Sequence, residues 1–522
     1  MEMNRRDFIK LAAGSTLAAH SFMNSVPFAA DIFEQNKKPL KFKNILFLLS
    51  DQQRQDCSCC YGNSVVQTPN LDRIAANGVR FTNAFTPTAV CCPARTSIQT
   101  GLLAHEHGIV RNPSFESGIF YGSTQNKHSR WTDSDRDPDP AIRFFSQSLA
   151  AAGWQLAHIG KWHIGMTKKP CDYGYENGVF YPGYGYPKKH EHYLSYLKQF
   201  GLDGFKLTEE KKDPSGRRSY YGLQEGPQEA SIPAYLRTQT VDAIRRFSKQ
   251  NKPFFISCNF WGPHEPVYIT KKHFEMYKDA DIRPWPNFDC DLSDKPDMLR
   301  RCGQFRATDW ITKQNLPDLI AKYYGYISLI DEEIGKIIQE LKKTGQLGDT
   351  LIVYTTDHGN SAGSYRMWDK GYGMYDCLYR IPFLVSNPSI KPGVCDGFVS
   401  LTDVANTFLE ISGCEKINTL EGRSLMPIIS GQTKAVRDDY IVCQGYGHQL
   451  AFWQRMVRTK DAKYIYNPTA KDEFYDLTSD PWETRNIIGT VDRAKLKKME
   501  TILLDEMKRT EDPLSNWASF TI

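Results

Sequence analysis

Four polar residues follow short apolar runs of the sequence. They are two acids, Asp51 and Asp357, one lysine, Lys161, and one histidine, His264. Side chains of these types serve acid–base catalysis and the stabilisation of charge. If the apolar runs are parallel strands of one sheet, their carboxyl ends meet at one edge, where open α/β sheets bind their ligands. The four residues therefore form a candidate active site.

The apolar runs are continuous, as is typical of strands that are buried on both faces. These strands are expected at residues 43–50, 155–160, 253–260 and 351–356. Amphipathic patterns between them predict helices at residues 69–77 and 321–343. Strands that alternate with helices predict an α/β fold, in which helices sandwich a large, mostly parallel sheet.

The pattern of predicted elements changes near residue 431. Short strand-like runs and a closing amphipathic helix near 493–508 predict a small antiparallel α+β subdomain at the C-terminus. Two polar insertions, 113–140 and 205–230, are expected to be surface loops. The Tyr- and Gly-rich stretch 172–188 suits a substrate-facing rim and an ordinary packed loop equally well.

The stretch AVCCPARTSIQTG, residues 89–101, places two cysteines at the start of a predicted helix. Pro93 suits the first turn of a helix and Gly101 suits its end. Residue 91 would then lie at the positive end of the helix dipole, where an anion is favoured. An isolated pair of adjacent cysteines is most often a pair of buried thiols, so this stretch alone does not give Cys91 a role.

Composition excludes several classes of protein. The chain has 522 residues, of which 40% are hydrophobic, enough for one large domain and a smaller one. The net charge is only +5 and no block of Lys and Arg stands out, which argues against nucleic acid as a partner. The 13 cysteines have no framework-like spacing, so most should be free thiols. No apolar run reaches about eighteen residues, so stable membrane insertion is not expected.

The first thirty residues are expected to be a signal peptide. Arg5 and Arg6 precede a weakly apolar stretch that closes at Ala29 and Ala30. The paired arginines resemble a bacterial twin-arginine export signal. Residues 1–30 are therefore predicted to be read by the twin-arginine translocase, and the mature chain is predicted to be periplasmic or secreted.

Several motifs together resemble one known family. Cys91 to Arg95 and the following Thr100-Gly101 match the signature C-x-P-[SA]-R of the type I sulfatases. Six further segments resemble that family in the expected order: TPNLDRIAANGVRFTNAF, GKWHIG, GPHEP, TTDHGN, WDKGYGMYD and FYDLTSDPWETRNI. The chain thus resembles a formylglycine-dependent sulfatase of the alkaline phosphatase superfamily over nearly its whole mature length. We expect a sulfatase catalytic domain over residues 31–430 and the C-terminal subdomain over residues 431–522.

The resemblance gives Cys91 a catalytic role. It implies that a formylglycine-generating maturation enzyme oxidises Cys91 to formylglycine. The hydrated aldehyde has one hydroxyl that can attack sulfur and a second whose deprotonation later expels sulfate, so water need not attack the covalent intermediate. Arg95, one helical turn further on, is expected to hold the modified residue.

The resemblance also implies a divalent metal site. Its ligands would be Asp51, Gln52, modified Cys91, Asp357 and His358. The oxygen ligands suit Ca²⁺, the usual ion of the family. The commonest family pattern has an aspartate at position 52 and an asparagine or glutamine at position 358. The histidine nitrogen suits a transition ion such as Mn²⁺ better than it suits calcium, and Mg²⁺ is a further alternative.

Acid and base roles follow from the same resemblance. Lys161 and His163 match residues that contact the sulfate and the aldehyde hydrate, and His163 is expected to take the proton of the hydrate. His264 and Lys370 match the pair that holds the bridging oxygen, one of which protonates the leaving alcohol. Lys161, Lys370 and Arg95 together would stabilise the charged transition state.

The expected function is an exported sulfatase that hydrolyses sulfate esters. Its substrate would be a sulfated small molecule or glycan, with sulfated carbohydrates favoured. Gln52 and His358 also resemble choline sulfatases and phosphonate monoester hydrolases, so a phosphonate monoester or phosphodiester hydrolase on the same scaffold is an alternative. A second alternative is an inactive glycan-binding homologue.

Overall fold

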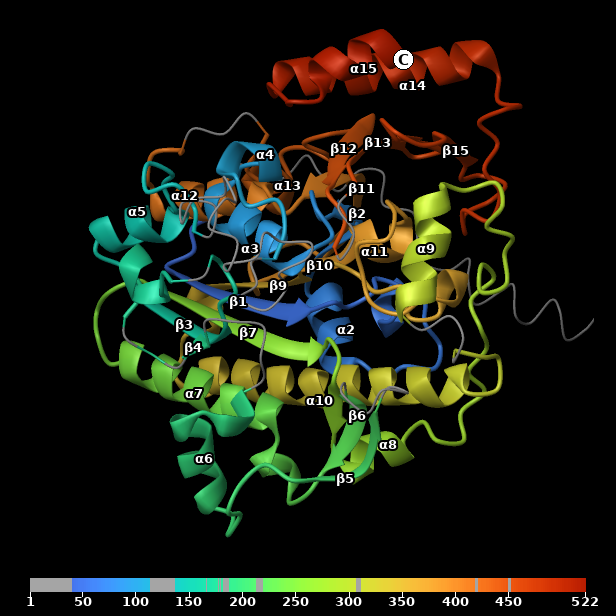
Figure 1. The fold of residues 1–522 in the computed structure, drawn as a ribbon. Helices are drawn as coiled ribbons and strands as arrows, with labels where there is room; N and C mark the ends of the chain where they lie inside the picture. The colour runs from blue at the N-terminus through green and yellow to red at the C-terminus, as the bar shows by residue number, and fades with distance from the viewer. Residues whose placement is uncertain are drawn as a thin grey trace, which may run out of the picture.

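The computed structural model describes residues 40–522, except for 113–136, 166, 177, 179, 182–186, 213–218, 307–310, 418–420 and 449–451. The predicted signal peptide and most of the predicted loop 113–140 lie outside the described residues. Figure 1 shows a central sheet with helices on both faces, and the C-terminal helices lie at one end of the molecule. Among the described residues, no helix is both long and apolar enough to cross a membrane.

The central sheet has eight strands in the order β11-β2-β10-β9-β1-β7-β3-β4. These strands are β1 (Asn44–Asp51), β2 (Gly78–Phe85), β3 (Gln155–Lys161), β4 (Phe180–Tyr181), β7 (Phe254–Pro263), β9 (Thr350–Thr356), β10 (Arg380–Ser386) and β11 (Gly393–Ser400). Strand β10 runs antiparallel to both of its neighbours, and the other pairings in this sheet are parallel. The predicted α/β fold with a mostly parallel sheet is confirmed, and the four predicted strands are β1, β3, β7 and β9.

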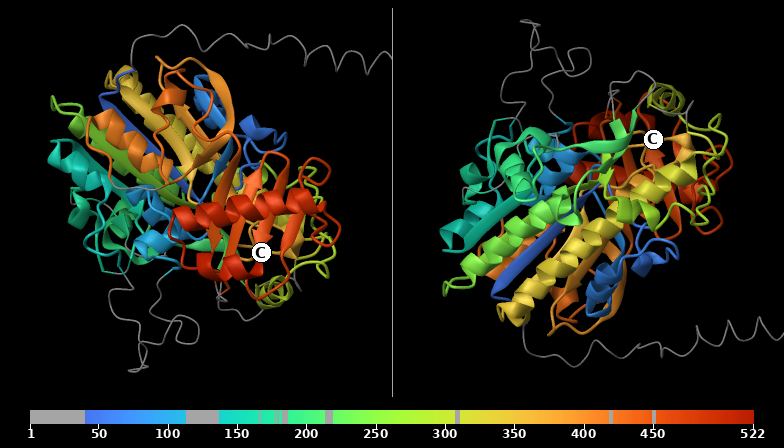
Figure 2. Two further views of the ribbon diagram at one scale, coloured as in Figure 1. Left: turned by 90° about the horizontal axis from the view of Figure 1, so that it is seen from above. Right: turned by 90° about the horizontal axis from the view of Figure 1, so that it is seen from below.

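Helices cover both faces of this sheet. Helices α7 (Ile232–Phe247) and α10 (Leu316–Lys343) lie side by side along one face, as Figure 2 shows from below. The other face carries α3 (Cys91–Thr100), α5 (Phe145–Ala151) and α12 (Asp403–Ser412). Further helices before the C-terminal region are α2 (Pro69–Ala76), α4 (Ala104–His107), α6 (Glu191–Lys198), α8 (Lys271–Glu275), α9 (Asp297–Arg306), α11 (Asp376–Tyr379) and α13 (Met426–Ile429).

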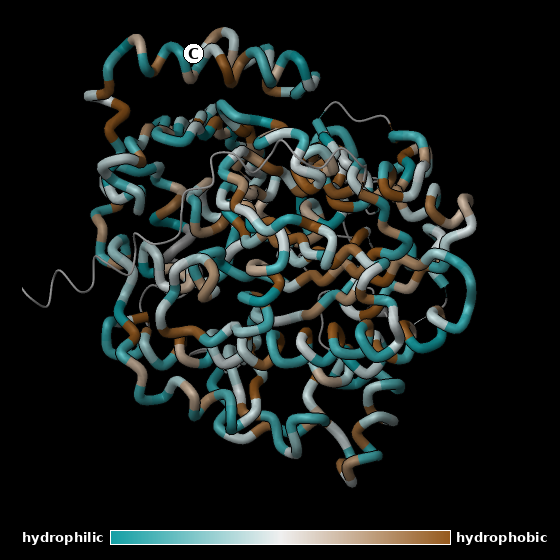
Figure 3. The backbone as a smooth tube through the Cα atoms, turned by 180° about the vertical axis from the view of Figure 1, so that it is seen from behind, coloured by the Kyte–Doolittle hydropathy of each residue, from teal (hydrophilic) through white to brown (hydrophobic). Residues whose placement is uncertain are grey.

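A hydrophobic core lies on each face of the central sheet, and the continuous apolar run of β1 contributes side chains to both cores. Successive side chains of a strand point to opposite faces, so Phe47 packs beside Phe408 of α12, with ring centroids 5.5 Å apart. Leu46 and Leu48 belong to the core beneath α10 instead. Burying one such side chain contributes about 1.5–3 kcal/mol. Figure 3 shows hydrophobic residues concentrated in the interior and hydrophilic residues on the outer helices.

Helix α10 is longer than the sequence predicted. It begins at Leu316 rather than near residue 321, and Pro317 lies in its first turn, where a missing backbone N–H costs nothing. Gly345, with φ of 71°, follows its C-terminus. The predicted helix at 69–77 corresponds to α2, which likewise has its proline in the first turn.

The C-terminal region forms a separate antiparallel sheet, as predicted. Its strands run in the order β12-β13-β14-β15. They are β12 (Tyr440–Gly445), β13 (Gln454–Thr459), β14 (Ala462–Tyr466) and β15 (Glu473–Asp476). Helix α14 (Arg493–Arg509) packs its apolar face on this sheet, and α15 (Ser515–Thr521) follows it, both at the top of Figure 1.

The expectation of a surface loop over residues 205–230 is wrong for two segments. Strand β6 (Ser219–Gln224) pairs with β5 (Leu207–Lys212) on one side and with β8 (Val267–Ile269) on the other, which forms a small third sheet. Most of β5 is exposed, and its sequence TEEKK has no apolar alternation that would predict a strand. Pairing with β6 holds this strand in place, and a single sequence does not show such pairing.

Candidate active site

The carboxyl ends of four strands bring the predicted residues together. Asp51 ends β1, Lys161 ends β3, and His264 and Asp357 directly follow β7 and β9. These strands are neighbours in the sheet order, so their ends share one edge. The Nζ atom of Lys161 lies 2.5 Å from Oδ2 of Asp51.

Arg95 joins the two acids. Its Nη2 donates to Oδ2 of Asp51 and its Nε donates to Oδ2 of Asp357, each at 2.9 Å. Its Nη1 donates to the backbone oxygen of Lys161 at 3.1 Å. The guanidinium is buried, and because α3 begins at Cys91, Arg95 lies one helical turn below that residue. Arg95 therefore fixes the positions of both carboxylates.

Asp51 is ionised despite complete burial. Burial alone would raise the pKa of its carboxyl group, but the charges of Lys161 and Arg95 hold this pKa well below its ordinary value. Both cationic partners contact Oδ2, and Oδ1 faces Sγ of Cys91 at 3.9 Å. One oxygen of Asp51 thus faces the cysteine while the other faces the cations.

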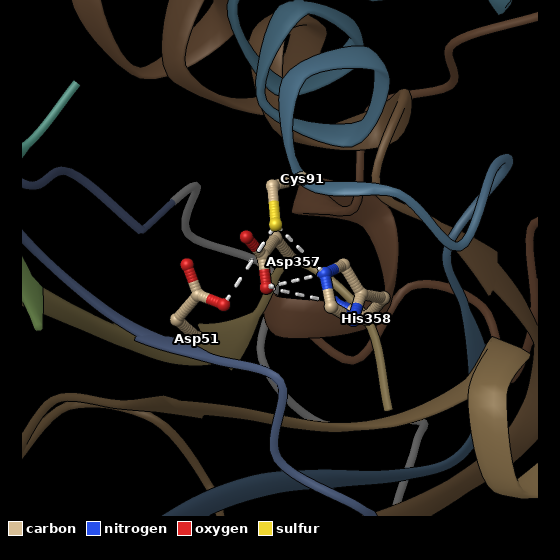
Figure 4. A group of neighbouring side chains, drawn as sticks. All are labelled: Asp51, Cys91, Asp357 and His358. Carbon is tan, nitrogen blue, oxygen red and sulfur yellow. Dashed lines mark hydrogen bonds and ion pairs between the residues drawn. The ribbon is translucent and has the colours of Figure 1, made fainter. Parts of the chain in front are cut away.

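Cys91 and His358 complete the donor group, a compact set of four side chains that could bind a metal ion: Asp51, Cys91, Asp357 and His358. Sγ of Cys91 lies 3.2 Å from Nε2 of His358 (Figure 4). Nδ1 of His358 lies 2.8 Å from the backbone oxygen of Gly359 and must donate to it, so Nε2 carries no proton in the neutral ring. An imidazole nitrogen in that state can bind a metal ion.

This donor group fits a divalent cation. One ligand atom each from Asp51, Cys91, Asp357 and His358 lies within 4.8 Å of the others, and all four residues are buried. Burial would lower the pKa of His358, but the neighbouring carboxylate of Asp357 and the contact with Cys91 raise this pKa above its ordinary value. The group therefore attracts positive charge. Carboxylate oxygens suit Ca²⁺, and the histidine nitrogen also suits Mn²⁺.

Gln52 and Lys370 adjoin this group. The backbone N–H of Gln52 donates to Oδ1 of Asp357 at 3.1 Å. Nζ of Lys370 lies 2.9 Å from Oε1 of Gln52 and 3.1 Å from Oδ1 of Asp369. It also lies 2.6 Å from Nε2 of His264. The predicted pair of His264 and Lys370 is thus in direct contact.

Two histidines of the site, His264 and His163, are neutral. Burial and the nearby charge of Lys370 hold the pKa of His264 well below its ordinary value. Its Nδ1 faces the backbone oxygen of Glu265 at 2.5 Å, which leaves Nε2 to accept from Lys370. Burial and the charges of Lys161 and Arg95 lower the pKa of His163 in the same way. A neutral imidazole can accept a proton, which is the role predicted for His163.

Backbone strain is concentrated around these residues. Gln52, His163 and Asp369 have φ values of 64°, 48° and 82°, in the left-handed region that most residues avoid. Gly160, with φ of 97°, precedes Lys161, and a Cβ atom there would lie 2.1 Å from the backbone oxygen of Asn259. Strain of this kind persists where the surrounding structure enforces it, commonly at functional sites.

Two acids of this site had no role predicted from the sequence. Glu265 and Asp369 are buried beside His264 and Lys370, and oxygens of both lie within 4.8 Å of a ring nitrogen of His264. Each directly adjoins a predicted catalytic residue in the chain, which was the available signal. A carboxylate next to a histidine or lysine is common on protein surfaces, so the signal was weak.

Comparison with known proteins decides the family. A family model described as Sulfatase matches residues 43–414. This chain belongs to the sulfatase family. It is accordingly a sulfuric ester hydrolase of the alkaline phosphatase superfamily, as its motifs predicted. A second model, described as N-sulphoglucosamine sulphohydrolase, C-terminal, matches residues 363–511 of this sulfatase.

Curated relatives of this sulfatase span nearly its whole length. An arylsulfatase of Clostridium perfringens is 27% identical over 486 residues, which cover 90% of this chain and 95% of the relative. An N-acetylglucosamine-6-O-sulfatase of Bacteroides thetaiotaomicron is 28% identical over 528 residues, with 91% and 87% covered.

Solved structures share the fold of this sulfatase. One, a complex with its substrate D-glucosamine-2-N,6-O-disulfate, matches with a TM-score of 0.69 at 22% identity, covering 91% of this chain and 99% of the other. A phosphonate monoester hydrolase of Agrobacterium radiobacter matches with a TM-score of 0.72 at 23% identity, covering 90% and 96%. At these identities the likeness concerns the fold alone.

Proposed function

We propose that this sulfatase hydrolyses sulfate esters of carbohydrates, with Cys91 converted to formylglycine and a divalent cation bound beside it. The observation that carries the proposal is the position of Cys91, at the N-terminus of α3 and within the buried donor group of Asp51, Asp357 and His358. The family generally uses a metal ion and formylglycine. Carbohydrate as the substrate class rests on the relative named N-acetylglucosamine-6-O-sulfatase.

The cation and the modified residue would supply the chemistry at sulfur. A cation held by Asp51, Gln52, Asp357, His358 and residue 91 would polarise the sulfate oxygens. Formylglycine would supply a hydrated aldehyde as the nucleophile. Residue 91 opens α3, and the positive end of the helix dipole favours the negative charge of the sulfate.

Each remaining residue moves or balances charge. Lys161 and Lys370 offset the charge of the transition state, and Arg95 keeps Asp51 and Asp357 in place. The contacting pair His264 and Lys370 delivers a proton to the bridging oxygen when the bond between sulfur and the alcohol breaks. Neutral His163 accepts the proton that is released when sulfate leaves.

Export belongs to the same proposal. The paired Arg5 and Arg6 support twin-arginine transport and a periplasmic or secreted enzyme. The twin-arginine route moves folded chains, and the buried Cys91 is inaccessible after folding. The maturation enzyme would therefore act in the cytoplasm before export. Unmodified Cys91 in the cytoplasmic precursor together with modified residue 91 in the exported protein would contradict this order.

Mass spectrometry of the tryptic peptide 81–95 tests the nucleophile. Protein from the native host should show conversion of Cys91 to formylglycine, and Cys91→Ala should abolish sulfate release from an aryl sulfate. Cys92→Ala is the matched control, because the neighbouring thiol is also buried but lies outside the donor group. An intact Cys91 thiol in active protein would overturn the proposed mechanism.

A phosphonate monoester or phosphodiester hydrolase is the second candidate. Gln52 and His358 favour it, since both depart from the commonest sulfatase pattern, and a phosphonate monoester hydrolase shares the fold. Rates with an aryl sulfate and an aryl phosphonate ester separate the candidates. A higher kcat/KM on the phosphonate ester would favour the second, whereas no turnover of either ester would favour an inactive glycan-binding homologue.

A further inference from the structure

The side chain of Gln52 is buried, and each end of its amide has a partner. Oε1 lies 2.9 Å from Nζ of Lys370, and Nε2 lies 3.0 Å from Oε2 of Glu265. The two ends of an amide are nearly identical in shape but opposite in hydrogen bonding. If the amide were turned over, its NH₂ group would face an ammonium and its oxygen would face a carboxylate. The two charged partners therefore allow one orientation.

The backbone holds Glu265 in position for this contact. The N–H of His264 donates to the backbone oxygen of Asp51 at 3.1 Å, which ties the end of β7 to the end of β1. Glu265 follows directly and is 1% exposed. A buried carboxylate needs hydrogen-bond donors, and the amide of Gln52 is one of them. Glu265 thus holds the NH₂ end of the Gln52 amide.

We propose that Glu265 is a positioning residue that sets the affinity of the site for a divalent cation by holding the oxygen of Gln52 toward the site. Partners that orient a metal ligand typically change metal affinity by about 10–100-fold when they are removed. The inference rests on the cation site of the proposed function.

Titration with Ca²⁺ alone, in competition with a chelating indicator, tests the role of Glu265. Glu265→Met keeps the length of the side chain but removes the acceptor, and it should weaken Ca²⁺ binding by about tenfold or more. Glu265→Gln keeps the shape but allows the amide of Gln52 either orientation, so a smaller loss is expected. The matched control is Glu332→Gln, which alters a similar contact to Nε2 of Gln228 far from the site.

An exchange of the two side chains distinguishes orientation from general damage. Gln52→Glu alone places two carboxylates against each other and should impair the local structure. The double variant Gln52→Glu/Glu265→Gln restores one donor and one acceptor with nearly unchanged shape, so Ca²⁺ affinity should return to within about threefold of wild type or exceed it. Recovery of this kind in a double-mutant cycle measures the coupling of the pair.

The outcomes separate this inference from the proposed function. If the wild-type protein binds neither Ca²⁺ nor Mn²⁺, the cation site itself fails. If wild type binds but Glu265→Met keeps its affinity within about twofold, Glu265 does not position Gln52. Thermal unfolding in chelator monitors folding. If Glu265→Met does not fold, the Glu265→Gln variant and the double variant decide, and unchanged affinity in Glu265→Gln together with no gain in the double variant overturns the inference.

Discussion

Arg95 and Lys161 contact the same carboxylate that would bind a cation. Both donate to Oδ2 of Asp51, and Arg95 also holds Asp357. The positive charges of Arg95 and Lys161 thus offset the negative charge of Asp51 at Oδ2, while Oδ1 of Asp51 faces Cys91. The arrangement keeps Asp51 ionised in a fully buried site, and a hard cation binds an ionised carboxylate.

Replacement of Arg95 should lower the free energy of unfolding and make it depend on Ca²⁺. Arg95→Met leaves two buried carboxylates short of a partner, and loss of one member of a buried pair costs about 3–5 kcal/mol. A cation that binds only the folded protein should recover part of this loss. Urea unfolding in chelator and in excess Ca²⁺ measures both effects. Arg437→Met is the control, because it breaks a buried pair with Asp403 away from the site and should be insensitive to Ca²⁺.

His264 should matter most for poor leaving groups. If the pair of His264 and Lys370 protonates the bridging oxygen, His264→Ala should lower kcat about 10²–10⁴-fold on an alkyl or sugar sulfate. A nitrophenyl sulfate leaves as a stable anion and should be much less affected. A loss of equal size on both substrates would instead indicate that His264 acts in binding or in folding.

At the scale of single elements, the helix α3 depends on the short helix α4. His107 of α4 is 1% exposed, and its Nδ1 accepts from the N–H of Ile109, so Nε2 donates to Oγ of Ser97 in α3. Burial lowers the pKa of His107 from 6.5 to about 3. The neutral ring therefore belongs to the folded packing of the helix that carries Cys91.

His107 should make stability depend on pH. Because the pKa of His107 is lower in the folded state, the unfolded chain binds a proton that the folded chain does not. The contribution of His107 to stability is therefore fully present above pH 6.5 and is lost as the pH falls toward about 3. The expected slope is about 1.4 kcal/mol per pH unit. Urea unfolding of wild type and His107→Asn between pH 7 and pH 4 should show a smaller slope in the variant. Equal slopes would mean that His107 does not control this dependence.

Strand β12 and the residues described after it reach the active-site loops. The N–H of Gln444 donates to the backbone oxygen of Pro87, four residues before Cys91. His448 packs on Gly371, the residue after Lys370, where a Cβ atom would lie 2.4 Å from its side chain. Trp453, directly before β13, is 46% exposed. Its ring lies 5.7 Å from that of Tyr446, and an exposed indole offers an apolar face to a sugar ring.

Trp453→Ala should therefore raise KM for a sulfated sugar several-fold and change little for a small aryl sulfate. Steady-state kinetics with both substrates measures the difference. Trp517→Ala removes a comparably exposed indole from the C-terminal helix α15 and should leave both values unchanged. Equal KM values for the sugar in wild type and Trp453→Ala would remove Trp453 from substrate binding.

Sequence signals differ in strength from element to element. The strands that end at Asp51, Lys161 and Asp357 were predictable, because burial on both faces demands continuous apolar runs. The strand β5 was not, because its exposed residues carry no periodic pattern. Glu265 was missed for a related reason, since its role depends on Gln52, which is far away in the sequence and adjacent only in the fold.

At the scale of the whole molecule, the C-terminal sheet anchors the loop that carries Lys370. Nζ of Lys463, on β14, lies 2.6 Å from Oδ1 of Asp376 and also pairs with Glu483. The N–H of Asp376 donates to Oε2 of Glu483 at 2.8 Å. Asp376 lies six residues beyond Lys370. The matched C-terminal family model likewise begins at residue 363, before this loop.

Lys463 should therefore couple stability to catalysis. Lys463→Met leaves Asp376 and Glu483 buried with one partner fewer, at a cost of about 3–5 kcal/mol in the free energy of unfolding. The loop after Lys370 loses an anchor, so kcat should fall as well, although Lys463 belongs to a different sheet from the four strands that carry the site. Urea unfolding and kinetics on an aryl sulfate measure the two effects.

Lys460→Met, which breaks an exposed pair with Asp396, should cost no more than about 1 kcal/mol and leave kcat unchanged. A Lys463→Met variant with reduced stability but wild-type kcat would show that the C-terminal sheet supports the fold without positioning Lys370.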